Sequence, residues 1–83
     1  MTWSVLWSSR SIRQLKKLDK KQVRRIRDTV LGITENPFIA VRKLSDSAFF
    51  RIRVQNYRII MDLQQGKMII FVVEVDHRRR VYN

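Results

Sequence analysis

The first part of the chain changes from a strand pattern to two helical patterns. Residues 3–7, WSVLW, are aromatic and β-branched, as is typical of a short strand. Ser8 or Ser9 can then cap a short helix, and Asp19 can cap a second one. Apolar residues recur at helical spacing after these caps, at Ile12, Leu15, Leu18, Val23, Ile26, Val30 and Ile33. Because the second stripe stops before Pro37, we expect an antiparallel helical hairpin that ends there.

The remainder of the chain is typical of three strands. After a loop over residues 38–48, the segments FFRIRV, YRIIMDL and KMIIFVVEV are rich in β-branched and aromatic residues. Gln55-Asn56 can form a two-residue loop in which the asparagine tolerates a positive φ, and Gly66 can supply the next turn. The last segment is almost continuously apolar, which predicts a strand inside the sheet with both faces covered. We therefore expect an α+β fold of order β-α-α-β-β-β, an N-terminal strand, a helical hairpin and an antiparallel three-stranded meander in one sheet, as one domain over residues 1–83.

The two-residue loop determines which side chains face each other across the predicted hairpin. It places Arg53 directly opposite Arg58 on the face away from the core, and Arg51 on the same face. Like charges in this relation destabilise a sheet, and only an anion between them would offset the repulsion. The last strand would bring HRRRVY, residues 77–82, to the same corner. We therefore expect an anion site there, and phosphate best matches the fork of an arginine.

The overall charge narrows the class of partner. The 83 residues carry 18 basic and 7 acidic side chains, for a formal net charge of +11. This excess favours nucleic acid as a partner, then an acidic protein, then an anionic membrane surface. The outer faces of the predicted helices are basic, and they are either simply solvated or in contact with phosphates. The cations on these faces that could contact phosphates include Lys17, Lys20, Lys21 and Arg24.

Residue types exclude several classes of protein. The chain has no cysteine and one histidine, which excludes disulfides, thiolate sites and histidine-rich metal sites. We therefore expect no metal and no cofactor. The N-terminus lacks the order of a signal peptide, and no apolar run approaches the roughly 20 residues that span a bilayer. The expected location is the cytoplasm, without a membrane partner.

A phosphate site beside a tyrosine is compatible with metal-free cleavage of RNA. RNA supplies its own nucleophile, the 2′-hydroxyl, so the protein must supply a base, cations for the phosphorane and an acid for the leaving oxygen. Neighbouring cations favour the phenolate of Tyr82 as the base. His77 is the side chain whose type titrates near neutral pH, although a lone histidine at a strand end is more often structural. The choice of base between these residues stays open.

The residues around this corner have a family resemblance. FFRIRVQNYRIIM followed by VVEVDHRRRVYN resembles the RelE branch of the RelE/ParE toxin superfamily, the ribosome-dependent mRNA endonucleases of type II toxin–antitoxin pairs. The likeness covers nearly the whole chain. It implies a helical hairpin on an antiparallel sheet, mRNA in the ribosomal A site as the substrate, and an acidic RelB-like antitoxin as a partner.

The resemblance also implies roles for individual residues of the predicted hairpin. Arg51 and Arg53 match basic positions, often lysine, that contact and stabilise the scissile phosphate. Arg58 matches an arginine assigned to stabilisation of the transition state. Because arginine replaces lysine at positions 51 and 53, we expect these two residues to act through charge rather than through proton transfer.

The C-terminal stretch receives its roles in the same way. Arg78 matches the arginine proposed to protonate the leaving group, and Tyr82 matches the terminal tyrosine proposed as base. Arg79 and Arg80 match no assigned catalytic role, and we expect them, with His77, to contact RNA or the ribosome.

Three other functions are compatible with the sequence. ParE-type members of the superfamily inhibit DNA gyrase and lack the set of basic residues and tyrosine, so Arg78 and Tyr82 speak against that function. A non-catalytic module that binds ribosomes or nucleic acid could use the tyrosine for stacking on a base. A toxin fold with decayed activity is the third alternative.

Overall fold

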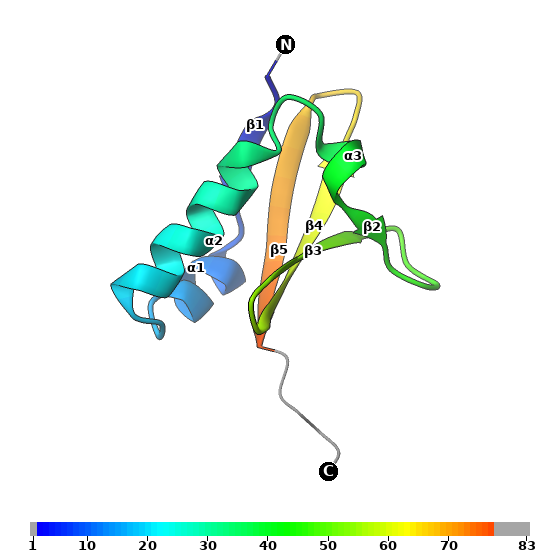
Figure 1. The fold of residues 1–83 in the computed structure, drawn as a ribbon. Helices are drawn as coiled ribbons and strands as arrows, with labels where there is room; N and C mark the ends of the chain where they lie inside the picture. Colours follow the sequence, from blue (N-terminus) through cyan, green and yellow to red (C-terminus); the bar gives the residue numbers. More distant parts are fainter. Residues whose placement is uncertain (1, 78–83) are drawn as a thin grey trace.

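The structure is a computed structural model that describes residues 2–77, and it has the predicted α+β class (Figure 1). The elements in chain order are β1 (Ser4–Trp7), α1 (Ser9–Leu15), α2 (Lys20–Gly32), α3 (Pro37–Ala40), β2 (Arg42–Lys43), β3 (Phe50–Val54), β4 (Tyr57–Gln64) and β5 (Ile69–His77). In Figure 1, α1 and α2 run in opposite directions, as the predicted hairpin requires.

The strands form one five-stranded sheet in the order β1-β5-β4-β3-β2. The pairs β2–β3, β3–β4 and β4–β5 are antiparallel, whereas β1 runs parallel to β5. The fully antiparallel sheet implied by the resemblance is therefore wrong at one edge. Three helices and the strands β2, β3 and β4 separate β1 from β5 in the chain, so no tight turn fixes their relative direction. As predicted, β5 lies inside the sheet.

A β-bulge interrupts the pairing of β4 with β5. Ile60 pairs with Glu74, and the next residue, Met61, pairs with Val72, which leaves Val73 as the extra residue of β5. The bulge shifts the alternation of β5 by one residue. Val72 faces the core before the bulge, and Val75 faces it afterwards.

The helices begin at the predicted caps. The Ser8 hydroxyl oxygen accepts a hydrogen bond from the Ser11 backbone N–H at 3.0 Å. The Asp19 carboxylate accepts one from the Gln22 backbone N–H at 2.9 Å. Both bonds satisfy backbone donors that the first turn of a helix leaves free.

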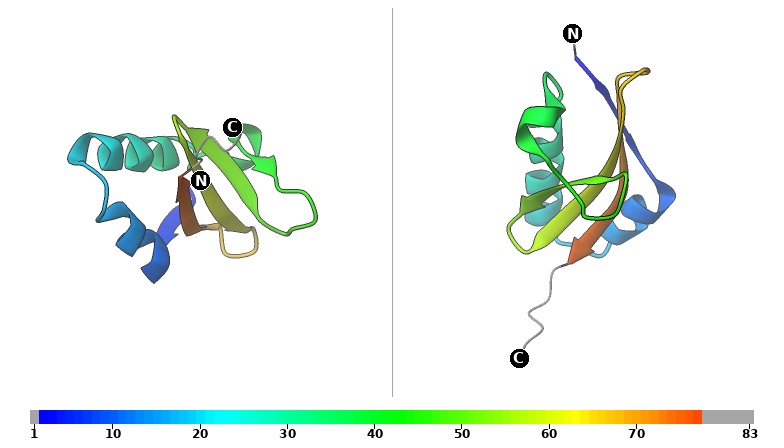
Figure 2. Two further views of the ribbon diagram at one scale, coloured as in Figure 1. Left: turned by 90° about the horizontal axis from the view of Figure 1, so that it is seen from below. Right: turned by 90° about the vertical axis from the view of Figure 1, so that its right-hand side faces the viewer.

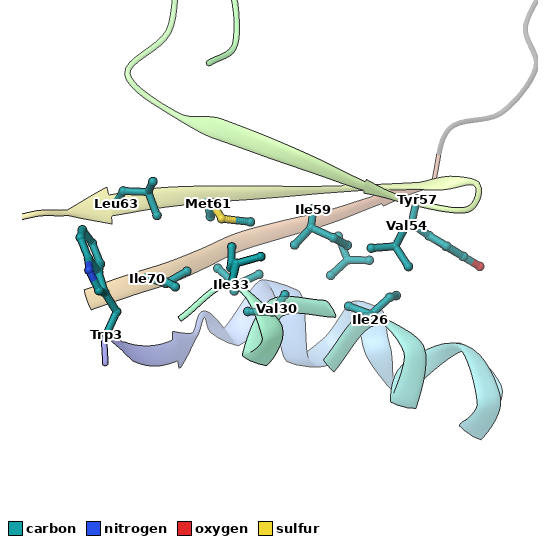
Figure 3. Packing of buried hydrophobic residues seen from close by; sticks show 12 residues of the cluster. Trp3, Ile26, Val30, Ile33, Val54, Tyr57, Ile59, Met61, Leu63 and Ile70 are labelled. Carbon is teal, nitrogen blue, oxygen red and sulfur yellow. The ribbon is translucent and has the colours of Figure 1, made fainter. Parts of the chain in front are cut away.

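The core lies between α2 and one face of the sheet (Figures 2 and 3). Figure 3 shows Ile26 and Val30 of α2 directed at the side chains of the strands. The strand residues that are completely inaccessible to solvent are Ile59, Met61, Ile70 and Val72. The predicted helical stripe and the predicted inward face of the hairpin therefore meet in one apolar layer.

Helix α1 covers the edge of β5 that β1 leaves open. β1 pairs only with residues 69–72 of β5. Beyond that point, the Ser8 hydroxyl donates a hydrogen bond to the carbonyl of Val73 at 2.7 Å. The Gln14 side-chain oxygen accepts one from the backbone N–H of Val75 at 2.6 Å. The side chains of Ser8 and Gln14 thus provide hydrogen bonds to β5 that a neighbouring strand would otherwise supply.

The predicted loop before the hairpin contains two short elements. Pro37 begins α3, where its missing N–H costs nothing because it stands in the first turn. Residues 42–43 form β2 on the edge of β3. Proline had indicated only the end of the preceding helix, and two paired residues are too few to give a strand pattern.

The two turns of the meander stand at the predicted residues, but their positive φ angles fall at other positions than expected. The left-handed residue of the first turn is Gln55, with φ 56°, and not Asn56. In the second turn Met68 has φ 53°, while neither glycine has a positive φ. The left-handed residue of the first turn thus precedes Asn56 by one position, and that of the second turn follows Gly66 by two positions.

No helix within residues 2–77 has the length and apolar character needed to cross a membrane.

The role of Ser8 gives a stability test. Its hydroxyl both caps α1 and bonds to the carbonyl of the bulged residue Val73. Ser8→Ala should therefore lower the free energy of unfolding by about 1–2 kcal/mol. Ser9→Ala is the matched control, because the Ser9 side chain is exposed, and it should have an effect within about 0.5 kcal/mol. Urea unfolding followed by circular dichroism measures both, and equal losses would contradict the role of the cap.

Candidate functional site

The predicted opposition of two arginines is present and has a third member. Arg53 of β3 stands directly opposite Arg58 of β4, as the two-residue loop predicts. On its other side, Arg58 stands opposite Asp76 of β5. We call these side-by-side residues of β3, β4 and β5 the charge row. They occupy the face of the sheet away from α2, since the neighbouring pair Val54–Tyr57 faces the core.

Within the charge row, Asp76 already provides a negative charge for Arg58. The Arg58 Nη2 atom donates a hydrogen bond to Asp76 Oδ2 at 2.8 Å. The two side chains are 33% and 34% exposed, so the pair is partly screened by solvent. A carboxylate of the chain itself therefore offsets part of the charge of Arg58, and the anion site between Arg53 and Arg58 stays a prediction.

The guanidinium of Arg58 is only partly satisfied. Its Nε atom is buried and has no hydrogen-bond acceptor among residues 2–77. Arg53, in contrast, is exposed. One arginine of the pair is thus held against the sheet by a carboxylate, and the other extends into solvent.

The same face carries further arginines. Arg51 stands opposite Ile60 of β4 on one side and opposite Arg42 of β2 on the other. Arg42 was not among the predicted site residues, because β2 itself was not predicted. The face that holds the charge row is therefore more basic at its β2–β3 edge than the hairpin alone indicated.

His77 lies on the opposite face of the sheet. It pairs with Tyr57, and the centroids of the two rings are 4.9 Å apart with a 36° angle between the ring planes. The Tyr57 hydroxyl donates a hydrogen bond to the side-chain oxygen of Gln22 on α2 at 3.2 Å. His77 therefore stands at the predicted end of the sheet but on the helix side, and the structure does not bring its ring together with Arg51, Arg53 and Arg58.

A cleft of about 290 Å³ lies beside this ring pair, between α1 and the adjoining ends of β4 and β5. Lys17 and Leu18 line it on the helix side, and Tyr57 and His77 line it on the sheet side. Among the described residues that line this cleft, Lys17 is the one cation from the basic helix faces predicted from the sequence.

The other predicted helix residues line two shallow hollows. Lys21 and Arg24 line one of about 450 Å³ on the outer surface of α2. Lys20 and Arg24 line another of about 300 Å³ between α1 and α2. The floor of the second hollow is apolar, formed by Leu15, Leu18 and Val23. All of these cations stand on the helices and not at the charge row.

The remaining predicted site residues, Arg78, Arg79, Arg80 and Tyr82, lie outside the described residues. For the part of the chain from residue 2 to residue 77, no group of three or more His, Cys, Asp or Glu side chains could hold a metal ion. The chemistry that the described face can supply is electrostatic: arginines able to bind an anion and to stabilise developing negative charge.

The sequence profile of the ParE toxin of the type II toxin–antitoxin system parDE matches residues 5–82 of the chain. The chain belongs to this toxin family. The predicted membership of the RelE/ParE superfamily is thereby confirmed, and the chain is a toxin of a type II toxin–antitoxin system. No curated protein gives a significant match.

Solved structures of toxins share the fold. The RelBE2 toxin–antitoxin complex from Mycobacterium tuberculosis matches with a TM-score of 0.86 and 20% identity, over 94% of this chain and 93% of the other. The archaeal RelE–RelB complex from Pyrococcus horikoshii matches with a TM-score of 0.83 and 23% identity, over 98% and 100%. A YoeB/ParE toxin from Agrobacterium tumefaciens matches with a TM-score of 0.74 and 14% identity, over 92% and 99%. At these identities the likeness establishes the fold.

The asymmetry of the charge row predicts opposite effects of two similar substitutions. Arg53→Gln removes the exposed member of the opposed pair and should raise the free energy of unfolding by about 0.2–0.5 kcal/mol. Arg58→Gln leaves Asp76 without its partner and should lower it by about 0.5–1 kcal/mol. Urea unfolding at low salt measures both, and 1 M NaCl should shrink both effects by screening. A loss of stability with Arg53→Gln would contradict the repulsion.

Proposed function

We propose that this toxin is a ribosome-dependent endoribonuclease that cleaves mRNA in the A site by metal-free attack of the 2′-hydroxyl. The observation that carries the proposal is the gathering of arginines on one face of β2–β4, the face away from α2. Arginine matches the geometry of phosphate and carries its positive charge throughout the physiological pH range. A flexible polyanion that crosses this face would meet cations at successive positions.

The proposed chemistry divides the roles between the sheet and the C-terminal stretch. Arg51 and Arg53 contact the scissile phosphate, and Arg58 stabilises the negative charge of the phosphorane. Arg78 protonates the leaving 5′-oxygen, and Tyr82 removes the proton of the 2′-hydroxyl. Electrostatic stabilisation of this kind is commonly the largest single contribution to catalysis, which suits a site built mostly of arginine.

The position of His77 favours Tyr82 over His77 as the base. The His77 ring packs on Tyr57 on the helix side of the sheet, whereas the phosphate-binding arginines project from the other side. A base must lie within hydrogen-bonding reach of the 2′-hydroxyl while the phosphate is bound. In this proposal His77 holds the end of the sheet. His77, Arg79 and Arg80 contact RNA away from the bond that is cleaved.

An acidic RelB-like antitoxin and the ribosome are the proposed partners, and the cytoplasm is the proposed location. The similar structures from Mycobacterium tuberculosis and Pyrococcus horikoshii are toxin–antitoxin complexes. The net charge of +11 favours an acidic partner and ribosomal RNA alike. Exposed cations on the helix side contribute to both encounters, mainly through the association rate: Lys17, Lys20, Lys21 and Arg24.

Inhibition of DNA gyrase is the second candidate function. It is favoured by the matching family profile, which is that of ParE. A module that binds ribosomes or nucleic acid without cleaving them would use the same basic face. These alternatives differ from the proposal in what happens to mRNA, so a direct readout of mRNA integrity separates them.

Expression of the toxin in cells should arrest translation through cuts within the codons of translated mRNA. Primer extension should show these cuts in a reporter message, and a copy of the message without its start codon should stay intact. Equal cutting of the untranslated copy, or of purified RNA, would reject the dependence on the ribosome. DNA breaks that require gyrase, with intact mRNA, would establish the ParE-type function instead.

The assignment of the base has its own test. Tyr82→Phe keeps the ring and removes the ionisable hydroxyl, so the single-turnover cleavage rate on programmed ribosomes should fall roughly 10²-fold or more. His77→Gln keeps a polar side chain at the strand end and should change the rate by less than about tenfold. The reverse pattern, a normal phenylalanine variant and an inactive glutamine variant, would assign the base to His77.

A further inference from the structure

We propose that Asp76 competes with the RNA phosphate for Arg58 and thereby sets the affinity of the toxin for RNA. This inference rests on the proposed function, since it takes Arg58 as a phosphate ligand. Asp76 holds the guanidinium in a resting position through Nη2, and a phosphate must compete with this carboxylate for Arg58.

The geometry of the ion pair is that of a contact that can be exchanged. Arg58 donates to Asp76 through Nη2 at 2.8 Å, while its buried Nε has no acceptor among the residues that the structure describes. Arginine–carboxylate pairs frequently form two parallel hydrogen bonds, whereas this pair has one. Leaving a buried donor unpaired is costly, so the resting position is not the best one available to this guanidinium.

The strength of the pair is suited to competition. Both side chains are about one third exposed, at 33% and 34%, and ion pairs of this kind change an equilibrium only a few-fold. A phosphate that is also held by Arg53 can therefore displace the carboxylate. Asp76 weakens RNA binding without preventing it.

No other acid of the described sheet face can take this role in place of Asp76. On the same face, the Oε2 atom of Glu74 lies 3.7 Å from the Nη2 atom of Arg10 on α1. Asp62, further along β4, accepts a hydrogen bond from Gln64 at 3.1 Å. Asp76 is directly opposite Arg58 in the register of β4 and β5, and Arg53 is opposite Arg58 on the other side. In the register of the sheet, residue 58 therefore stands between Asp76, the proposed competitor, and Arg53, the proposed second phosphate ligand.

Asp76→Asn is the direct test, because asparagine keeps the shape and an accepting oxygen but removes the charge. The probe is a fluorescent single-stranded RNA with 2′-O-methyl groups, which lacks the nucleophile and cannot be cut. The variant should bind it roughly two- to fivefold more tightly than the unchanged toxin at low salt. Because salt also weakens the Arg58–Asp76 pair, the gain should shrink as the salt concentration is raised, so the slope of log affinity against log salt should be steeper for the variant.

Two controls separate competition from a general effect of charge. Asp62→Asn removes the same charge from the same face and should leave the slope unchanged. In an Arg58→Gln background, Asp76→Asn should lose its effect on both affinity and slope. Urea unfolding of each variant verifies that it is folded, and Asp76→Ser offers a second substitution if the asparagine variant is unstable.

Each outcome decides the proposal. Tighter binding and a steeper slope that require Arg58 support it. Unchanged binding, weaker binding, or a gain that persists without Arg58 would overturn it. The assay measures binding and not cleavage. If the toxin cuts no mRNA but shows the Arg58-dependent effect, the proposed function is wrong and the proposed competition between Asp76 and phosphate is supported.

Discussion

The register of β4 against β5 is the constraint on which the site depends. This pairing sets Arg58 opposite Asp76 and, one residue on, Tyr57 opposite His77. The two pairs face opposite sides of the sheet, so a single alignment of two strands separates an ion pair from an aromatic pair. A slip by one residue would exchange the two faces and bury charge against α2. The apolar cluster over Ile59 and Val75 makes such a slip costly.

The edge of β5 shows how the fold protects this register. A strand edge without a partner exposes backbone donors and acceptors and invites pairing with another chain. Here β1 covers the first part of the edge, and Ser8 and Gln14 cover part of the remainder. The N-cap of α1 is thus also an anchor for β5. Folding of the first helix and completion of the sheet are consequently coupled through the same hydroxyl.

Local patterns in the sequence were sufficient for most of the architecture. The caps Ser8 and Asp19, the two-residue loop and the pairing of Arg53 with Arg58 each depend on residues close in the chain, and all are confirmed. The parallel direction of β1 depends on a contact between distant segments, which no local pattern specifies. The same limit applies to the site. Asp76 stands opposite Arg58 across a long-range strand pair, so the sequence indicated two opposed arginines but not the carboxylate beside them.

The bulge at Val73 has a consequence for how this strand is compared with others. Before it, the even-numbered residues of β5 face the core, and after it the odd-numbered ones do. This change of phase explains why the odd-numbered Val75 is in the core together with the even-numbered Ile70 and Val72. In a toxin without the extra residue, the residues that follow this point in the strand would face the opposite side of the sheet. Residues after this point can therefore be equated between toxins only once the bulge is known to be shared. Otherwise a gapless alignment would exchange Asp76, which stands opposite Arg58, for His77, whose ring packs on Tyr57 on the other face.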